Sequence, residues 1–147
     1  MKKNIPDIEE FMKLKSFAII GVSAKKKKFG NIIYKQLLRH GKKIYPIHRY
    51  AMLIEGTPCY PDISNLPEKP EGIILNIHPE ETEKAVKEIS AEGIKHVWMQ
   101  QGSESKAAIE YCKSHGIKAI SGNCILMFLE KPGFPHNFHH WIWGMGK

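Results

Sequence analysis

The strongest constraint on this sequence is a short joint that occurs three times. Residues 40–44 (His-Gly-Lys-Lys-Ile), 92–96 (Glu-Gly-Ile-Lys-His) and 115–119 (His-Gly-Ile-Lys-Ala) each place a glycine after a helical pattern and a lysine at the entry to a stretch suited to a strand. Glycine commonly ends helices because it adopts the left-handed conformation without a Cβ penalty. Repeated passage from helix to strand predicts a parallel sheet with right-handed crossovers.

Five strands and four helices fit around these joints. The predicted strands are residues 17–20, 43–48, 72–77, 96–99 and 118–120, and the predicted helices are residues 5–14, 30–40, 78–92 and 104–115. Ile33, Leu37 and Leu38 are expected to form the apolar face of the second helix. The irregular stretch 49–70 is long for a loop and is expected to hold a short strand or a helical turn near residues 63–66. This pattern predicts an α/β fold with a doubly wound parallel sheet of about five strands, in three αβα layers.

Length, charge and cysteine content narrow the class of protein. At 147 residues the chain is predicted to be one domain, with an N-terminal helix in residues 1–15 and an aromatic, histidine-rich C-terminal extension in residues 131–147. The net charge of +7 favours anionic partners. Three scattered cysteines suggest a reducing compartment. Neither a signal-peptide pattern nor an apolar stretch of transmembrane length is visible, so a cytoplasmic location is expected.

The first predicted strand leads into a glycine turn, a basic loop and a helix. Residues 21–23 (Gly-Val-Ser) follow the strand, lysines occupy residues 25–28, and residues 29–31 (Phe-Gly-Asn) begin the helix. The first turn of a helix offers N–H donors and a partial positive charge, so this arrangement is typical of a phosphate site. Gly21 allows a tight turn close to a ligand. The full G-x-G-x-x-G pattern is missing, and an ordinary connection with a solvated lysine run is the alternative.

The end of the second predicted strand carries His48 and Arg49. Nicotinamide dinucleotide sites place an acid at this position to bind the ribose hydroxyls, whereas here the nearest acid is Glu55. Basic residues suit a phosphate on or near that ribose, as in NADP with its 2′-phosphate or coenzyme A with its 3′-phosphate. A surface His-Arg pair without a ligand is the alternative.

Several short motifs together resemble a known family. They are residues 21–23, 29–31, 45–48 (Tyr-Pro-Ile-His), Gly56 with 60–67 (Tyr-Pro-Asp-Ile-Ser-Asn-Leu-Pro), 97–100 (Val-Trp-Met-Gln) and 123–127 (Asn-Cys-Ile-Leu-Met). In order and spacing they are similar to the small CoA-binding proteins. These are single Rossmann-like domains that resemble the CoA-binding N-terminal domain of succinyl-CoA synthetase α subunits. The resemblance covers about residues 15–130.

The resemblance implies a role for each part of the predicted site. The turn after the first strand would lie along the diphosphate, and Asn31 would face it from the helix start. The lysine loop and the His48–Arg49 corner would bind phosphates, and residues 76–78 would border the adenine. The expected cofactor-binding residues are Gly21, Val22, Ser23, Lys26, Lys28, Phe29, Gly30, Asn31, His48, Arg49, Asn76, Ile77 and His78.

Three further features have competing interpretations. Cys124 follows the last strand and either reacts near the pantetheine end of a bound CoA or is a buried small apolar residue, which is favoured. Gln100 and Gln101 either donate to a ligand carbonyl or cap the next helix. His136, His139 and His140 have the spacing of helical metal ligands, but aromatics beside them favour coverage of an apolar patch on this domain or a partner chain, so no metal is predicted.

The sequence therefore predicts a Rossmann-like domain that binds coenzyme A or an acyl-CoA and has no catalytic activity of its own. The synthetase domain with the phosphorylated histidine has no counterpart in this sequence. One alternative is an NADP-binding, dehydrogenase-like domain that acts with a partner. Another is a basic nucleic-acid accessory protein, although no recognition motif supports specific nucleic-acid binding. Association with itself or another protein through the C-terminal aromatic segment is expected, and membrane association is not.

Overall fold

The computed structural model describes residues 5–25 and 28–129. Predictions for Lys26 and for the C-terminal extension, with its three histidines, lie outside these residues. The helices and strands, in chain order, are α1 (Ile5–Lys13), β1 (Ser16–Ile20), α2 (Phe29–Arg39), β2 (Lys43–Ile47), β3 (Leu53–Ile54), β4 (Thr57–Pro58), η1 (Ile63–Asn65), β5 (Gly72–Leu75), α3 (Pro79–Ala91), β6 (His96–Gln100), α4 (Lys106–Ser114), β7 (Lys118–Asn123) and η2 (Ile125–Phe128). None of the described helices is long and apolar enough to cross a bilayer.

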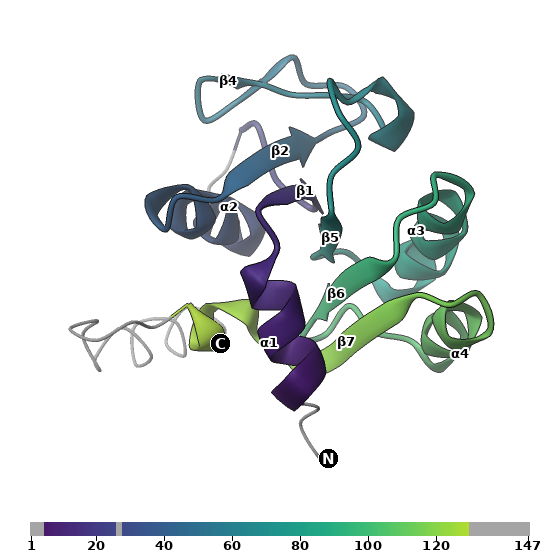
Figure 1. Cartoon of the computed structure of the whole chain (residues 1–147). Helices are drawn as coiled ribbons and strands as arrows, with labels where there is room; N and C mark the ends of the chain where they lie inside the picture. Colours follow the sequence, from purple (N-terminus) through teal and green to yellow (C-terminus); the bar gives the residue numbers. More distant parts are fainter. Residues whose placement is uncertain (1–4, 26–27, 130–147) are drawn as a thin grey trace.

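Five strands form one parallel sheet in the order β2-β1-β5-β6-β7 (Figure 1). In its register, Ile19 of β1 lies between Pro46 of β2 and Ile74 of β5. The chain runs outward from β1 to β2 and then crosses back to β5, so the strand order reverses between β1 and β5. Ligands of open α/β sheets bind beyond the carboxyl ends of the strands at such a switch point.

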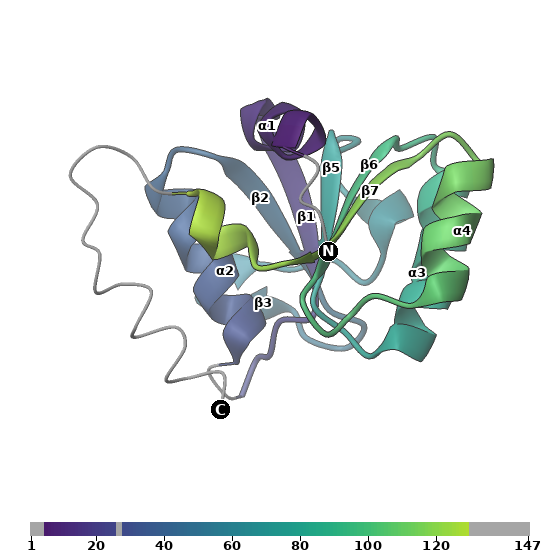
Figure 2. The same cartoon turned by 90° about the horizontal axis from the view of Figure 1, so that it is seen from below.

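Helices cover both faces of this sheet. Figure 2 shows α2 on one side, and α3 with α4 on the other. The core on the α2 side includes Phe17 and Ile19 together with residues of α1, α2 and η2. The core on the other side includes Ala18 with residues of α3 and α4. Burial of alternate β1 residues on both faces explains its continuous apolar sequence, and the predicted doubly wound, three-layer fold is confirmed.

The repeated joint has the predicted conformation. Gly41, Gly93 and Gly116 have φ values of 77°, 76° and 70° and follow α2, α3 and α4. One detail of α2 was predicted wrongly, because Leu38 is 45% exposed whereas Tyr34 is 1% exposed. The buried stripe of α2 ends at Leu37, so Leu38 in its last turn lies outside the core.

The irregular stretch between β2 and β5 contains the predicted short strand and helical turn. Strands β3 and β4 form an antiparallel hairpin, and both residues of its turn, Glu55 and Gly56, have positive φ values of 52° and 78°. Further along, the Tyr60 N–H donates to the Pro46 carbonyl at 3.1 Å, on the outer edge of β2. The missing N–H of Pro46 also faces outward, which explains how proline fits this strand.

Candidate functional site

Three backbone segments pass very close to one another at the switch point. A Cβ atom on Gly21 would lie 2.1 Å from the Asn76 carbonyl oxygen, and a Cβ on Gly30 would lie 2.1 Å from the Gly21 carbonyl oxygen. Gly21 also has a φ of +119°. The sequence suggested glycine at position 21 so that a ligand could approach. In the structure the nearby space is occupied by the protein backbone, so this glycine is required by packing between β1 and β5.

Asn31 shapes the loop between β1 and α2. Its side chain is buried, with the residue only 3% exposed. The Oδ1 atom accepts the Ser23 N–H at 2.8 Å, and Nδ2 donates to the Ser23 carbonyl at 2.8 Å and to Glu55 Oε2 at 2.9 Å. Lys35 pairs with the same Glu55 carboxylate at 3.3 Å. Asn31 lies at the helix start as predicted, but these bonds direct its amide toward the protein, so it fixes the loop against the β3–β4 hairpin.

Helix α2 begins with Lys28 as its N-cap residue. Lys28 has an extended backbone, with φ −103° and ψ 172°, and its side chain makes no capping bond. The first bonded N–H in the helix is that of Asn31, which donates to the Lys28 carbonyl at 2.9 Å. The amides of Phe29 and Gly30 precede it, in the first turn where helices offer donors to anions. A cation at the N-cap adds to the positive potential here.

Three adjoining clefts surround this loop. The switch-point cleft, about 380 Å³ in volume, is lined by Gly21, Val22, Lys28, Asn76, Ile77, His78, Glu81, Gln101, Gly102 and Ser103. The carboxylate cleft, about 740 Å³, includes Ile20, Gly21, Val22, His48, Arg49, Tyr50, Asp62, Ile77, Glu81, Lys84 and Glu88. The lysine cleft, about 430 Å³, is lined by Ser23, Ala24, Lys25, Lys28, His48, Tyr50 and Ala51. Most of the predicted residues thus border one continuous region.

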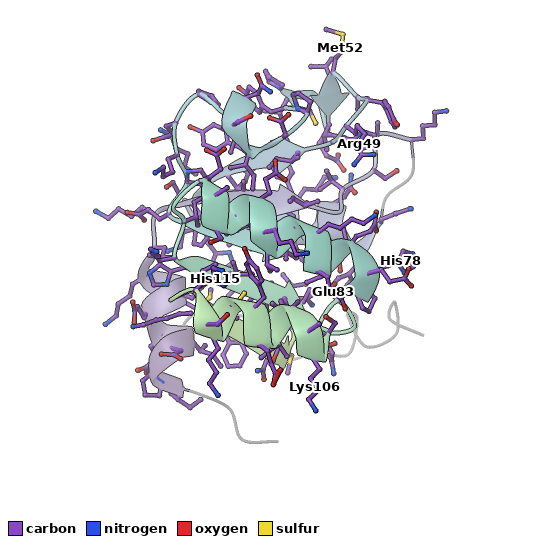
Figure 3. The ribbon with its side chains drawn as sticks, turned by 90° about the vertical axis from the view of Figure 1, so that its right-hand side faces the viewer. Arg49, Met52, His78, Glu83, Lys106 and His115 are labelled. Atoms are coloured by element: carbon purple, nitrogen blue, oxygen red, sulfur yellow. The ribbon has the colours of Figure 1, made fainter. Side chains whose placement is uncertain are left out.

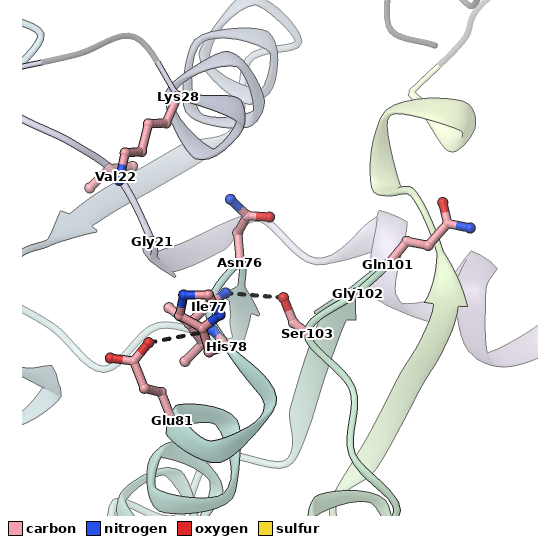
Figure 4. Close-up of a pocket in the computed structure, with 10 residues that line it drawn as sticks. All are labelled: Gly21, Val22, Lys28, Asn76, Ile77, His78, Glu81, Gln101, Gly102 and Ser103. Carbon is pink, nitrogen blue, oxygen red and sulfur yellow. Dashed lines mark hydrogen bonds between the residues drawn. The ribbon is translucent and has the colours of Figure 1, made fainter. Parts of the chain in front are cut away.

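Hydrogen bonds fix two of the segments that line the switch-point cleft (Figure 4). The Ile77 N–H donates to Ser103 Oγ at 3.0 Å, and Ser103 is 3% exposed. The His78 N–H donates to Glu81 Oε1 at 3.4 Å within the capping box that begins α3. The Ile77–Ser103 bond ties the loop after β5 to the loop after β6, and the His78–Glu81 bond fixes the start of α3. The sequence prediction missed Ser103, although its place in the loop after the fourth strand of the large sheet is a signal for a site residue.

His48 lies between the carboxylate cleft and the lysine cleft. Its Nδ1 atom accepts the N–H groups of Tyr50 at 3.1 Å and Ala51 at 3.0 Å. A ring nitrogen that accepts hydrogen bonds carries no proton, so the neutral ring has its proton on Nε2. His48 therefore stabilises the turn at residues 48–51 and can donate from Nε2.

Arg49 lines the carboxylate cleft together with Asp62, Glu81 and Glu88, which the sequence analysis did not place near it. Hydrogen bonds from Ser64 and Asn65 lower the pKa of Asp62. Burial and the nearby Asp62 charge raise the pKa of Glu88, and the positive charge of Arg49 acts in the opposite direction. Figure 3 shows Arg49 at the same end of the molecule as His78, where α3 begins. The basic corner predicted from His48 and Arg49 is thus a mixed-charge cleft.

The surroundings of the three cysteines and of Gln100 favour structural roles for these residues. Burial raises the pKa of the thiols of Cys59 and Cys124, and raises that of Cys112 to about 11. Gln100 is 2% exposed, and its Oε1 accepts the Ile125 N–H at 3.0 Å, so it fixes the start of η2. Gln101 lines the switch-point cleft. Within residues 5–25 and 28–129, no group of histidine, cysteine or acidic residues is arranged to bind a metal ion.

Comparison with known proteins assigns most of the chain to one family. Residues 15–130 match the family model described as a CoA binding domain. The chain is 27% identical to the ADP-forming acetate–CoA ligase I of Archaeoglobus fulgidus over 123 residues, which cover 77% of this chain and 18% of the ligase. It is 23% identical to subunit alpha of the ADP-forming acetate–CoA ligase II of Pyrococcus furiosus, covering 80% of this chain and 28% of that subunit. The chain thus spans less than a third of these relatives.

One solved structure agrees in size as well as in fold. A conserved hypothetical protein from Pyrococcus furiosus superposes with a TM-score of 0.73 and is 31% identical. The match covers 78% of this chain and 98% of that protein. The similarity therefore extends over an entire small protein as well as over part of larger ligases.

Proposed function

Because the chain belongs to the CoA-binding domain family, we propose that it binds coenzyme A or an acyl-CoA at the switch point of its sheet. The observation that carries the proposal is the convergence of the turn at Gly21 and Val22, the N-cap Lys28 and residues 76–78 around one cleft. These segments come from three separate regions of the sequence. Their meeting point is where open α/β sheets bind nucleotides.

The proposed contacts follow from the chemistry of the ligand. The diphosphate lies along the backbone of Gly21 and Val22 and receives the charge of Lys28, since charge-assisted hydrogen bonds are the strong ones. Ile77 and Val22 offer apolar contact to the uncharged parts of the ligand. Asn31 acts indirectly, because its bonds to Ser23 fix the shape of the loop.

We further propose that this domain binds CoA without catalysing acyl transfer by itself. Burial raises the pKa of all three thiols, which disfavours the thiolate needed for nucleophilic attack. The curated relatives are acetate–CoA ligases, and one of them is named as a subunit. A partner protein that supplies the catalytic groups would complete an active site around the CoA bound here.

Isothermal titration calorimetry with CoA, NADP and a DNA oligonucleotide tests this proposal. We expect CoA to bind most tightly and with a shallow dependence on salt. Mass spectrometry of ligand released on denaturation provides an independent check of what the purified protein retains. Tighter binding of NADP would favour the dehydrogenase-like alternative, and a steep salt slope with DNA but no CoA binding would favour the nucleic-acid alternative.

A further inference from the structure

We propose that two parts of the bound nucleotide lie on opposite sides of the turn at residues 48–51. The 3′-phosphate of CoA enters the lysine cleft, and the adenine enters the carboxylate cleft. This inference rests on the proposed function and specifies where the two parts of the nucleotide lie. It also moves the phosphate away from Arg49, which the sequence alone had suggested as its partner.

The charges that line the two clefts differ in sign. The carboxylate cleft contains the cations Arg49 and Lys84 but also three carboxylates, those of Asp62, Glu81 and Glu88. The lysine cleft contains Lys25 and Lys28, and no carboxylate is among its described lining residues. A phosphomonoester carries about −1.5 to −2 charges at neutral pH. The phosphate is therefore repelled by the first lining and attracted by the second.

Arg49 is a poor phosphate partner because Asp62, Glu81 and Glu88 line the same cleft. It favours the ionised form of Glu88, whereas Asp62 disfavours that form. A phosphate placed beside Arg49 would add a third negative group close to these two carboxylates. Neither Arg49 nor the two lysines of the lysine cleft form an ion pair with a described residue, so the difference between them lies in the carboxylates that line the carboxylate cleft.

His48 lies on the boundary between the carboxylate cleft and the lysine cleft, and its side chain can contact a ligand group in either. Its Nδ1 is occupied by the N–H groups of Tyr50 and Ala51, so the proton lies on Nε2. A neutral Nε2–H donates to a ribose hydroxyl or a phosphate oxygen without any change of protonation. This placement fits a ribose above the turn, with its base on one side and its 3′-phosphate on the other.

The carboxylate cleft suits adenine for a complementary reason. The exocyclic amino group of adenine is a hydrogen-bond donor, and ionised carboxylates are pure acceptors. Glu88 borders this cleft from α3, and the apolar side chains of Ile20 and Ile77 line it as well. An uncharged ring with one amino donor is thus matched to a lining that would reject a phosphate.

Calorimetry with CoA and 3′-dephospho-CoA tests the phosphate assignment. We expect wild-type protein to prefer CoA by about tenfold, which corresponds to about 1.4 kcal/mol. Lys25→Ala should reduce this preference, and Lys25→Ala combined with Lys28→Ala should nearly abolish it. Arg49→Ala and Lys84→Ala are matched controls from the carboxylate cleft and should leave the ratio unchanged. Loss of the preference in Arg49→Ala, with retention in the lysine variants, would overturn the assignment.

The base is tested with adenosine 3′,5′-bisphosphate and its hypoxanthine analogue, in which a carbonyl replaces the amino group. Wild-type protein should prefer the adenine compound several-fold, and Glu88→Ala should reduce that preference while the protein stays folded by circular dichroism. Equal affinity of the wild type for both compounds would remove adenine from the carboxylate cleft. Failure of the wild type to bind CoA at all would instead refute the proposed function itself.

Discussion

The two ends of the sheet are stabilised by different chemistry. At the amino ends of the strands, lysine side chains make the contacts: Lys118 Nζ lies 2.8 Å from Glu10, and Lys42 Nζ donates to the backbone carbonyls of Met12 and Leu14, near the end of α1. At the carboxyl ends, the neutral side chains of Asn31 and Ser103 hold two of the loops, those after β1 and β5. Neutral groups that shape the site leave the nearby lysines available for an anion. The predictions below test this difference.

The largest expected effect comes from crowding at the carboxyl end. Gly21→Ala would place a Cβ 2.1 Å from the Asn76 carbonyl oxygen, at a φ of +119°. Backbone strain alone costs about 1–3 kcal/mol, and the clash adds to it. We expect the free energy of unfolding to fall by more than about 4 kcal/mol, or the variant not to fold. Denaturant titration followed by circular dichroism measures the change.

Gly116→Ala at the amino end is the matched control. Gly116 also has a positive φ, +70°, but no atom lies within 4 Å of the position of an added Cβ. The left-handed conformation alone should cost about 1–2 kcal/mol. Similar losses in the two variants would contradict the conclusion that packing of β1 against β5 requires Gly21.

The next effect in size concerns the neutral side chain that shapes the loop. Asn31→Ala removes bonds to both backbone groups of Ser23 and to Glu55. Loss of a partner to a buried polar group costs about 1–3 kcal/mol, so we expect a decrease of about 2–3 kcal/mol in the free energy of unfolding. CoA affinity should fall as well, because the loop loses its fixed shape.

Glu55→Gln separates these contributions. It keeps an acceptor for the Asn31 amide but removes the charge that pairs with Lys35. An ion pair with one exposed partner, as Lys35 is here, contributes about 1 kcal/mol, so the variant should stay near wild-type stability and affinity. A loss as large as that of Asn31→Ala would show that the negative charge of Glu55, rather than the Ser23 bonds of Asn31, is the main contribution to the shape of the loop.

The difference between local and long-range contacts explains how much could be predicted from the sequence. The three glycine joints predicted the alternating elements, because a helix ending is a local property of the chain. The meeting of the turn at residues 21–23 with residues 76–78 followed from general rules for parallel sheets. The position of Leu38 depended on where α2 leaves the core, which the periodicity of the sequence does not show.

The roles of individual polar residues were much harder to predict. Asn31 appeared as a ligand contact because its bond to Glu55 spans 24 positions and depends on the folded hairpin. Arg49 appeared as a phosphate partner because the acid nearest to it in sequence is Glu55. In the folded chain its charge acts on Glu88, from α3. Long-range contacts of this kind decide which cations are available to a ligand.

The smallest expected effect lies at the amino end, where charge provides the contact. The hydrogen bond from Lys118 lowers the pKa of Glu10, and His96 lies 3.5 Å from the same carboxylate. A carboxyl group whose pKa is lowered by folding contributes stability above its unfolded pKa and loses it as the pH falls through the folded value. Glu10→Gln should therefore be slightly less stable than wild type at pH 7, and the difference should shrink as the pH falls through the folded pKa of Glu10.

Salt and pH together separate this contact from those at the carboxyl end. At about 1 M salt the Debye length shrinks to about 3 Å, so the exposed Glu10–Lys118 pair should lose most of its contribution. The cost of Asn31→Ala should change less with salt, because two of its three bonds join the neutral amide of Asn31 to backbone groups of Ser23. Unfolding titrations of both variants at pH 7 and about pH 3, at low and high salt, measure the two responses. A constant cost of Glu10→Gln across all four conditions would contradict a charge-based contact at the amino end, because glutamine keeps the acceptor oxygen and removes only the charge.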